Sequence, residues 1–302
     1  MKFYLRYCCA TLFALIGFLL ATPQRAQAQT RKAYVAQSAD KTTLTFYYDA
    51  LRSTRTGKSW GIEETKREGN NTFPAWAGTW YVDDSTTTRV VFDASFRDFR
   101  PTTTAWWFCR YRALKQIEGL EYLNTSEVKD MSSMFWGCLV LKSLDLKNFN
   151  TKNVTNMSWM FCDCVALTSI DLKNFNTQNV IDMSGMFSDC AALKSLDLKN
   201  FNTQNVTDMS YMFLGCTSLT SLDLKNFNTK KVTNMYEMFS GCAALRTINS
   251  NTTWQCQVSK DMFAGCTKLK GAVAYDKNKV DAKMANPEKG YFTAESTTVR
   301  SR

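Results

Sequence analysis

The sequence predicts an α/β repeat fold, in which short coils of the chain stack into a solenoid. A pattern of 26 residues returns five times, almost unchanged, within the 302 residues. Its units start at Thr125, Thr151, Thr177, Thr203 and Thr229. Within each unit, the apolar residues first follow a spacing of three and four residues and then a spacing of two. A fixed period of this length is typical of chains whose units bury their apolar faces by stacking on their neighbours.

The first part of each unit predicts a short helix. In the second unit, the apolar residues are Val154, Met157, Met160 and Phe161. Their spacing places them in one stripe along a helix, and we interpret the stripe as core because such stripes usually pack rather than bind cofactors. The residue before the repeat cysteine would end the helix in a left-handed conformation. Glycine stands there in four units and aspartate in two (Asp163 and Asp189), and aspartate tolerates that conformation better than most residues.

The second part of each unit predicts a strand with one buried face. In the first unit, Leu144 and Leu146 alternate with polar residues on both sides, which is the two-residue period of a strand. When the units stack, these strands form a parallel sheet on one face of the solenoid. The short helices then lie on the other face.

Two motifs within the unit resemble a known family. The pattern Leu-x-x-Leu-x-Leu-x-x-Phe-Asn is similar to the strand segment of a leucine-rich repeat, and Asn-Val-Thr-x-Met-x-x-Met-Phe-x-x-Cys is more specific. Together they resemble the BspA-like leucine-rich-repeat surface proteins of host-associated bacteria, which share their repeat with a family of mycoplasma surface lipoproteins. The match runs from about Thr88 to Leu269. The resemblance implies an exported, surface-displayed binding protein; members of the family are linked to adhesion, and no catalytic residues come with it.

Residues 1–28 are predicted to be a signal peptide. Lys2 and Arg6 give a positive start, an apolar run from Tyr7 to Ala21 follows, and a small-x-small cleavage site ends at Ala28. The apolar run is shorter than the ~20 residues that a membrane span needs. We therefore expect cleavage near Ala28 and a protein that is secreted or held at the cell surface, without a transmembrane segment.

The charge distribution argues against a nucleic-acid partner. Cleavage would remove Lys2, Arg6 and Arg25 and no acidic residue, which lowers the formal net charge from +10 to +7. The remaining lysines recur through the repeats, interleaved with aspartates, and do not gather in a basic patch with base-stacking aromatic residues. This pattern is typical of a solvated surface, with a general attraction to acidic cell surfaces.

Three segments are expected after the signal peptide. Residues 29–100 read as a β-rich N-terminal cap, with strand candidates at 43–48 and 89–92. Residues 101–270 form the leucine-rich-repeat solenoid, and residues 271–302 form a C-terminal cap and tail. Distinct caps are expected because each open end of a solenoid would otherwise expose apolar core.

The tryptophans of the N-terminal cap, Trp60, Trp76 and Trp80, allow two interpretations. They can pack the cap, since large aromatic side chains usually supply core area. Alternatively, they can form an exposed platform that binds carbohydrate. We favour packing.

The sequence offers little for catalysis. It contains no histidine, which removes the Ser-His-Asp and Cys-His arrangements and the commonest zinc ligand. No glycine-rich phosphate loop is present, and the recurring acidic residues form a ladder rather than one special pair. We expect no enzyme activity, no cofactor and no bound metal.

Two rows of charge are the candidate binding site. Stacking would place equivalent strand residues ~4.8 Å apart. The rows consist of Asp145, Asp171, Asp197 and Asp223, and of Lys147, Lys173, Lys199 and Lys225. Such a striped, extended face is what solenoids use to bind partners, although the stripes could also merely keep the sheet soluble. A cation along the aspartate row is a third option, which we disfavour because the carboxylates line up without converging.

Nine cysteines remain after cleavage, so at least one is unpaired within the chain. The six in register are Cys138, Cys164, Cys190, Cys216, Cys242 and Cys266. We expect them to point into the core as small reduced residues rather than to pair. Cys162 lies off this row and is the expected reactive thiol.

The sequence therefore predicts an exported surface binding protein, an adhesin that contacts host extracellular matrix proteins or other microbes through the exposed strand face. Two alternatives stay open. The chain could be a structural surface component without a specific ligand, or it could bind carbohydrate through its N-terminal tryptophans.

Overall fold

The computed structural model describes residues 30–294. The predicted signal peptide and residues 295–302 of the predicted tail lie outside the described residues. All the described strands and helices belong to one compact unit, which begins at Lys32.

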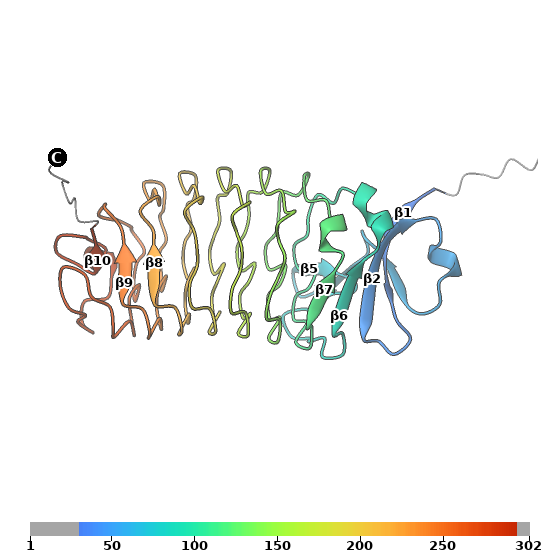
Figure 1. Cartoon of the computed structure of the whole chain (residues 1–302), viewed down its shortest axis with the longest axis horizontal. Coiled ribbons are helices and arrows are strands. Elements are labelled where there is room, and N and C mark those ends of the chain that lie inside the picture. Colours follow the sequence, from blue (N-terminus) through green and yellow to red (C-terminus); the bar gives the residue numbers. More distant parts are fainter. Residues whose placement is uncertain (1–29, 295–302) are drawn as a thin grey trace, which may run out of the picture. The chain divides into compact units, whose positions relative to one another are not determined.

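A five-stranded sheet forms the N-terminal part of this unit, with the strand order β3-β1-β2-β6-β7 (Figure 1). Its strands are β1 (Lys32–Gln37), β2 (Thr43–Asp49), β3 (Ser59–Gly61), β6 (Arg89–Phe92) and β7 (Gln116–Glu118). β1 is antiparallel to β2 and β3, whereas β2, β6 and β7 run parallel. Strands β4 (Thr65–Glu68) and β5 (Asn71–Pro74) form a separate antiparallel hairpin. The two predicted strands at 43–48 and 89–92 coincide with β2 and β6.

Beyond β7, successive coils of the repeat lie side by side (Figure 1). Their phenylalanine rings stack in one column through the core. The ring centroids of Phe135 and Phe161 are 5.7 Å apart, those of Phe161 and Phe187 5.7 Å, and those of Phe187 and Phe213 6.0 Å. Each of these rings is fully buried, as is the cysteine three residues after it. The interior is therefore built by the same residue from each unit, as the 26-residue period predicts.

The predicted short helices are wrong. Among the described residues, the only helical elements are the short 3-10 turns η1 (Arg52–Thr54), η2 (Ala94–Asp98), η3 (Leu120–Tyr122) and η4 (Ala282–Met284). In the repeats, the N–H of Phe135 donates to the carbonyl of Met160 in the next coil (2.9 Å), while the N–H of Met160 closes a turn on Met157 (3.3 Å). The backbone groups that a helix would pair internally are thus shared between neighbouring coils.

Residues with a left-handed backbone conformation turn the chain at regular intervals, and these turns explain why the apolar spacing resembles that of a helix. Trp159 and Asp163 have φ values of 57° and 61°, and every repeat has left-handed residues at these two positions. Because the chain turns in this way every four residues, Met157 and Met160 are both buried, as they would be in an amphipathic helix. The expectation of left-handed residues before the repeat cysteines is confirmed, with Asp189 at 56° and Gly215 at 67°.

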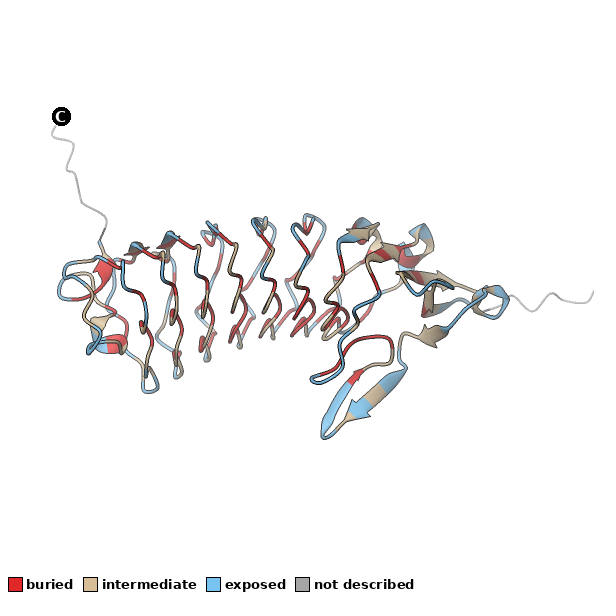
Figure 2. Ribbon diagram, turned by 90° about the horizontal axis from the view of Figure 1, so that it is seen from below, coloured by how far each residue is buried: buried red, intermediate tan, exposed pale blue. Residues whose placement is uncertain are grey.

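The strand side of the coils is partly regular. The last three strands, β8 (Ser221–Asp223), β9 (Thr247–Asn249) and β10 (Phe292–Thr293), form a parallel sheet in the order β10-β9-β8. In the earlier units the equivalent segments are not assigned as strands, but Leu144 and Leu146 are still buried and Asp145 exposed. The alternation of buried and exposed residues along the coils is visible in Figure 2.

Aromatic residues close the phenylalanine column at both ends. Phe108 stacks on Phe135 with ring centroids 5.5 Å apart, and Phe46 of β2 contacts Phe108 at 5.8 Å. At the other end, the ring of Tyr291 meets Phe263 at 5.4 Å. The apolar ends of the column are therefore covered by segments that precede and follow the repeats.

Candidate functional site

The predicted aspartate row lies on the exposed strand side, and each carboxylate closes a turn. The Oδ1 atom of Asp145 accepts a hydrogen bond from the N–H of Lys147 (3.2 Å), and Asp171 accepts from Lys173 (3.1 Å). The same bond recurs at Asp197 and Asp223, at 3.2 and 3.3 Å. An aspartate that bonds the backbone two residues on is a common turn former. These aspartates therefore have a structural role besides their charge.

Three residues of the lysine row pair with the aspartate two positions earlier in the same coil. Lys147 Nζ lies 2.8 Å from Asp145 Oδ2, Lys173 Nζ lies 3.7 Å from Asp171 Oδ2, and Lys225 Nζ lies 3.5 Å from Asp223 Oδ2. The hydrogen bond from Lys147 lowers the pKa of Asp145, and the same bond raises the pKa of Lys147. Exposed pairs of this kind contribute little to stability, because water and salt screen them. The structure therefore places the two rows side by side on one surface and leaves both accessible.

Beside the strand side, the Asn-Val-Thr part of the repeats lines a groove of about 660 Å³ that crosses several coils. Each asparagine is held by the preceding coil: Asn153 Nδ2 donates to Ser126 O (2.7 Å), and Asn179 Nδ2 donates to Lys152 O (2.8 Å). Ile181 is 49% exposed in the middle of the groove. Sequence reasoning missed this feature, although the repeated Asn-x-Thr pair indicates two polar side chains on the same face.

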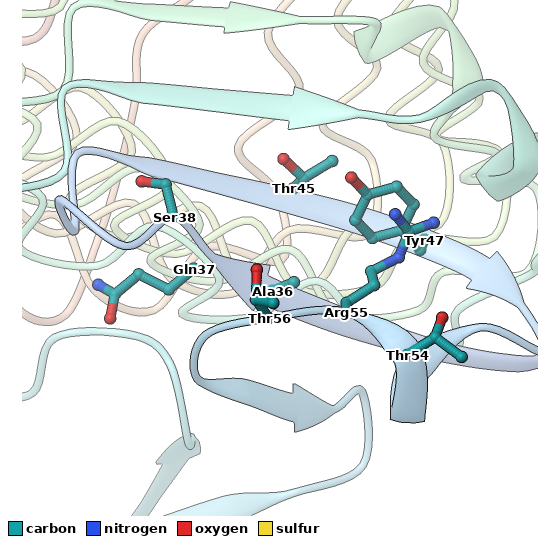
Figure 3. A pocket seen from close by; sticks show the side chains of 8 residues that line it. All are labelled: Ala36, Gln37, Ser38, Thr45, Tyr47, Thr54, Arg55 and Thr56. Carbon is teal, nitrogen blue, oxygen red and sulfur yellow. The ribbon is translucent and has the colours of Figure 1, made fainter.

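A second hollow of about 440 Å³ lies on the N-terminal sheet (Figure 3). The Arg55 guanidinium lies 3.5 Å from the centre of the Tyr47 ring and pairs with Asp49 Oδ2 at 2.7 Å. Arg55 Nε also donates to the hydroxyl of Tyr34 at 2.5 Å. Burial raises the pKa of Tyr34 to about 12, so the hydroxyl stays protonated at neutral pH. The positive charge of Arg55 is therefore already balanced by Asp49.

The N-terminal tryptophans mostly pack. Trp76 is buried, and its Nε1 donates to the carbonyl of Trp107 at 3.1 Å. Trp80 remains 36% exposed and meets the rings of Trp106 and Trp136 at 5.0 and 4.6 Å. Trp60 is partly buried against the core. The three residues therefore do not form one continuous exposed platform.

The cysteines of the described residues are free thiols. Each of the six in register is buried and donates its S–H to a phenylalanine carbonyl one coil earlier, for example Cys190 to Phe161 at 3.2 Å. The prediction that Cys162 is the reactive thiol is wrong. Its side chain is buried, and burial raises its pKa well above the ordinary value. Cys256 is the most accessible of the nine described cysteines, the other eight being buried.

Nothing in the part of the chain that the structure describes gathers three or more histidine, cysteine or acidic side chains in the manner of a metal site. Among these residues there is also no helix of the length and hydropathy that crossing a membrane requires.

Comparison with known proteins gives one family. The family described as "Mycoplasma protein of unknown function, DUF285" matches residues 102–196 and 168–275. No curated protein is similar enough to count as a relative. A leucine-rich repeat protein from T. pallidum has 17% sequence identity and a TM-score of 0.35, with 79% of this chain and 88% of that chain covered.

Two further solved structures are similar. A leucine-rich cell surface protein from Faecalibacterium prausnitzii A2-165 has 17% identity and a TM-score of 0.24, with 73% of this chain and 53% of that chain covered. A leucine-rich-repeat protein from Eubacterium ventriosum ATCC 27560 has 13% identity and a TM-score of 0.28, with 89% of this chain and 95% of that chain covered.

Proposed function

This chain belongs to the DUF285 family, and from that premise we propose that it is an exported cell-surface repeat protein that acts as an adhesin. It would bind a host extracellular matrix protein or the surface of another microbe through the aspartate and lysine rows. The segments 1–28, 29–100, 101–270 and 271–302 would serve as signal peptide, N-terminal cap, binding array, and C-terminal cap with its tail.

The observation that carries this proposal is the recurrence of one solvent-accessible ion pair at the same place in three of the four coils that carry both residues. Each of these pairs joins an aspartate to the lysine two residues later, as Asp145 does with Lys147 and Asp171 with Lys173. Because each pair is weak and solvated, a partner with complementary charges can replace it at little cost. Several such replacements along one extended partner add up to a specific contact, and complementary charge also steers the encounter.

The structural-component alternative makes a different prediction. If the rows only keep the surface soluble, removing their charge changes solubility and leaves every interaction of the protein unchanged. The carbohydrate alternative gains no support from the cap, because Trp76 is buried and Trp60 partly buried.

The test is solid-phase binding of the purified chain to matrix proteins, mucins and bacterial cells, at low and at physiological salt. Asparagine is the right substitution, because it keeps the side-chain oxygen that closes each turn and removes only the charge. The test variant carries Asp145→Asn, Asp171→Asn and Asp197→Asn. Saturable binding at physiological salt that this variant loses would support the adhesin.

A matched control removes three charges elsewhere on the repeats. Asp130, Asp182 and Asp208 also accept backbone hydrogen bonds from the residue two positions on, at 2.8 Å each. Asn156 and Asn234 already occupy the equivalent position in other units, so asparagine is compatible with this turn. The triple asparagine variant at these three positions should bind as the unchanged protein does. If both variants lose binding equally, the effect is net charge and the strand-side rows are not the site.

A further inference from the structure

A strip of aromatic side chains from the methionine-rich segments of the repeats spans four coils. The rings of Trp159 and Tyr211 are 5.6 Å apart, and those of Tyr211 and Tyr236 are 5.2 Å apart. We call Trp159, Tyr211 and Tyr236 the aromatic strip. All three are partly exposed, whereas the neighbouring Met157 and Met160 are fully buried.

The strip and the charged rows of the proposed adhesin site lie on different segments of each coil. Met157 and Met160, beside Trp159, and Leu172, beside Asp171, are buried in the same core cluster. The strip is a separate surface from the rows, and the inference below does not rest on the proposed function.

A glycine in the intervening coil allows the strip to form. Trp159 and Tyr211 are two repeats apart, and the residue between them in the same row is Gly185, with a φ of 59°. A Cβ atom on Gly185 would lie 2.3 Å from the six-membered ring of Trp159. The indole therefore covers Gly185, which is buried, and reaches over the intervening coil to Tyr211. Any other residue at position 185 would push the indole away.

Three carboxylates belong to the same segments of the repeats. Asp163 and Asp189 follow Trp159 and Gly185 by four residues, and like them have positive φ values. The Asp189 carboxylate reaches toward the next coil, because a Cβ on Gly215 would lie 2.2 Å from its Oδ1 atom. Glu237 adds a third carboxylate, which accepts a hydrogen bond from the Tyr236 hydroxyl.

The carboxylate of Asp163 has an unfavourable environment. Partial burial and the charge of Asp189 both raise its pKa. Arg110 and Arg112 act on it from a distance, but they already pair with Asp83, at 2.6 and 2.5 Å. A cation that arrived at the strip would relieve this environment, whereas a neutral ligand would not.

We propose that the aromatic strip, with Asp163, Asp189 and Glu237, is a second binding surface that takes an arginine- or lysine-bearing segment of a partner protein. The faces of Trp159 and Tyr211 attract a guanidinium or ammonium group, and the carboxylates pair with it. The formal net charge is +10 over all 302 residues and +7 without the predicted signal peptide, so a basic segment gains nothing from the net charge and depends on local carboxylates. The negative charge that attracts such a segment comes from Asp163, Asp189 and Glu237.

The experiment measures the fluorescence anisotropy of a labelled ten-residue peptide that alternates arginine and glycine, titrated with the full chain at physiological salt. The expected result is saturable binding, with no binding of the same peptide after arginine is replaced by glutamine. The double variant Asp163→Asn and Asp189→Asn should weaken binding about tenfold. Asparagine is chosen because it tolerates the left-handed backbone of both positions.

A second variant, Trp159→Ser, tests the aromatic part, and Ser133 already occupies the equivalent position with a φ of 53°. It should weaken binding by a similar factor. Three results would overturn the proposal: no binding of the arginine peptide, equal binding by the unchanged chain and the double variant, or equal binding of the glutamine peptide. Tight binding of a neutral oligosaccharide such as maltoheptaose, without binding of the arginine peptide, would assign the strip to sugar instead.

Discussion

The thiol of Cys164 donates a hydrogen bond to the carbonyl oxygen of Phe135, one coil earlier, over a distance of 3.3 Å. Cys190, Cys216 and Cys242 repeat this bond to Phe161, Phe187 and Phe213. The repeat cysteine is therefore a small buried donor that ties each coil to the one before it. This role requires a reduced thiol, which explains why six cysteines can stand in register without pairing.

Replacing Cys164 by alanine should destabilise the fold by about 1–2 kcal/mol, because the substitution removes a buried donor and leaves a small void. Urea unfolding followed by circular dichroism measures this change. Cys256→Ala is the control, since Cys256 is only partly buried and its loss should cost less than about 0.5 kcal/mol. Equal stability of the two variants would contradict a role for the thiol ladder.

Thiol reactivity should follow burial. Of the nine described cysteines, Cys256 should be alkylated first by iodoacetamide at neutral pH, and Cys162 and the six ladder thiols should react only after unfolding. Mass spectrometry of the digested protein assigns the label to each cysteine. Labelling of Cys162 at the rate of Cys256 would show that the side chain is accessible in solution.

Stability should fall at alkaline pH. Burial raises the pKa of Cys164, Cys216 and Cys266 from the ordinary 9.0 to about 12. The folded chain therefore holds protons that the unfolded chain releases above pH 9.0. Their stabilising contribution is complete below that pH and is lost as the pH rises toward the folded values. The urea midpoint should decrease steadily from pH 9 to pH 11, and a constant midpoint would contradict the buried-thiol description.

The phenylalanine column should be the most sensitive part of the core. Phe187 is fully buried between Phe161 and Phe213, so Phe187→Ala should cost about 3–5 kcal/mol and Phe187→Leu less than half of that. Urea unfolding of both variants gives the two values. If alanine cost no more than leucine, the rings would not be packed in solution as the structure places them.

Much of the architecture could be predicted because one period controls it. The 26-residue spacing fixes which side chains stack, and the burial of Met157, Phe161 and Leu146 follows directly from it. The helix prediction failed because a left-handed corner every four residues buries the same positions as a helical turn. Gly185, in the middle of one predicted helix, was the available warning, since glycine is unfavourable inside a helix.

The surfaces were harder to predict than the core. The Asp145 and Lys147 rows could be read from the sequence because both residues lie in one short segment. The contact between Trp159 and Tyr211 depends on a glycine in the coil between them, and no local pattern indicates it. The double role of Asp145, which closes a turn as well as carrying charge, also needed the backbone geometry.

The central claim, that the strand-side rows bind a partner, is tested most directly by one ratio. It is the apparent Kd of the Asp145→Asn, Asp171→Asn and Asp197→Asn variant divided by that of the unchanged protein, for the best matrix protein or cell surface of the panel at physiological salt. We expect a ratio of about ten or more, with the control variant at Asp130, Asp182 and Asp208 remaining near one. A ratio near one for the strand-side variant, with its fold intact, would contradict the account.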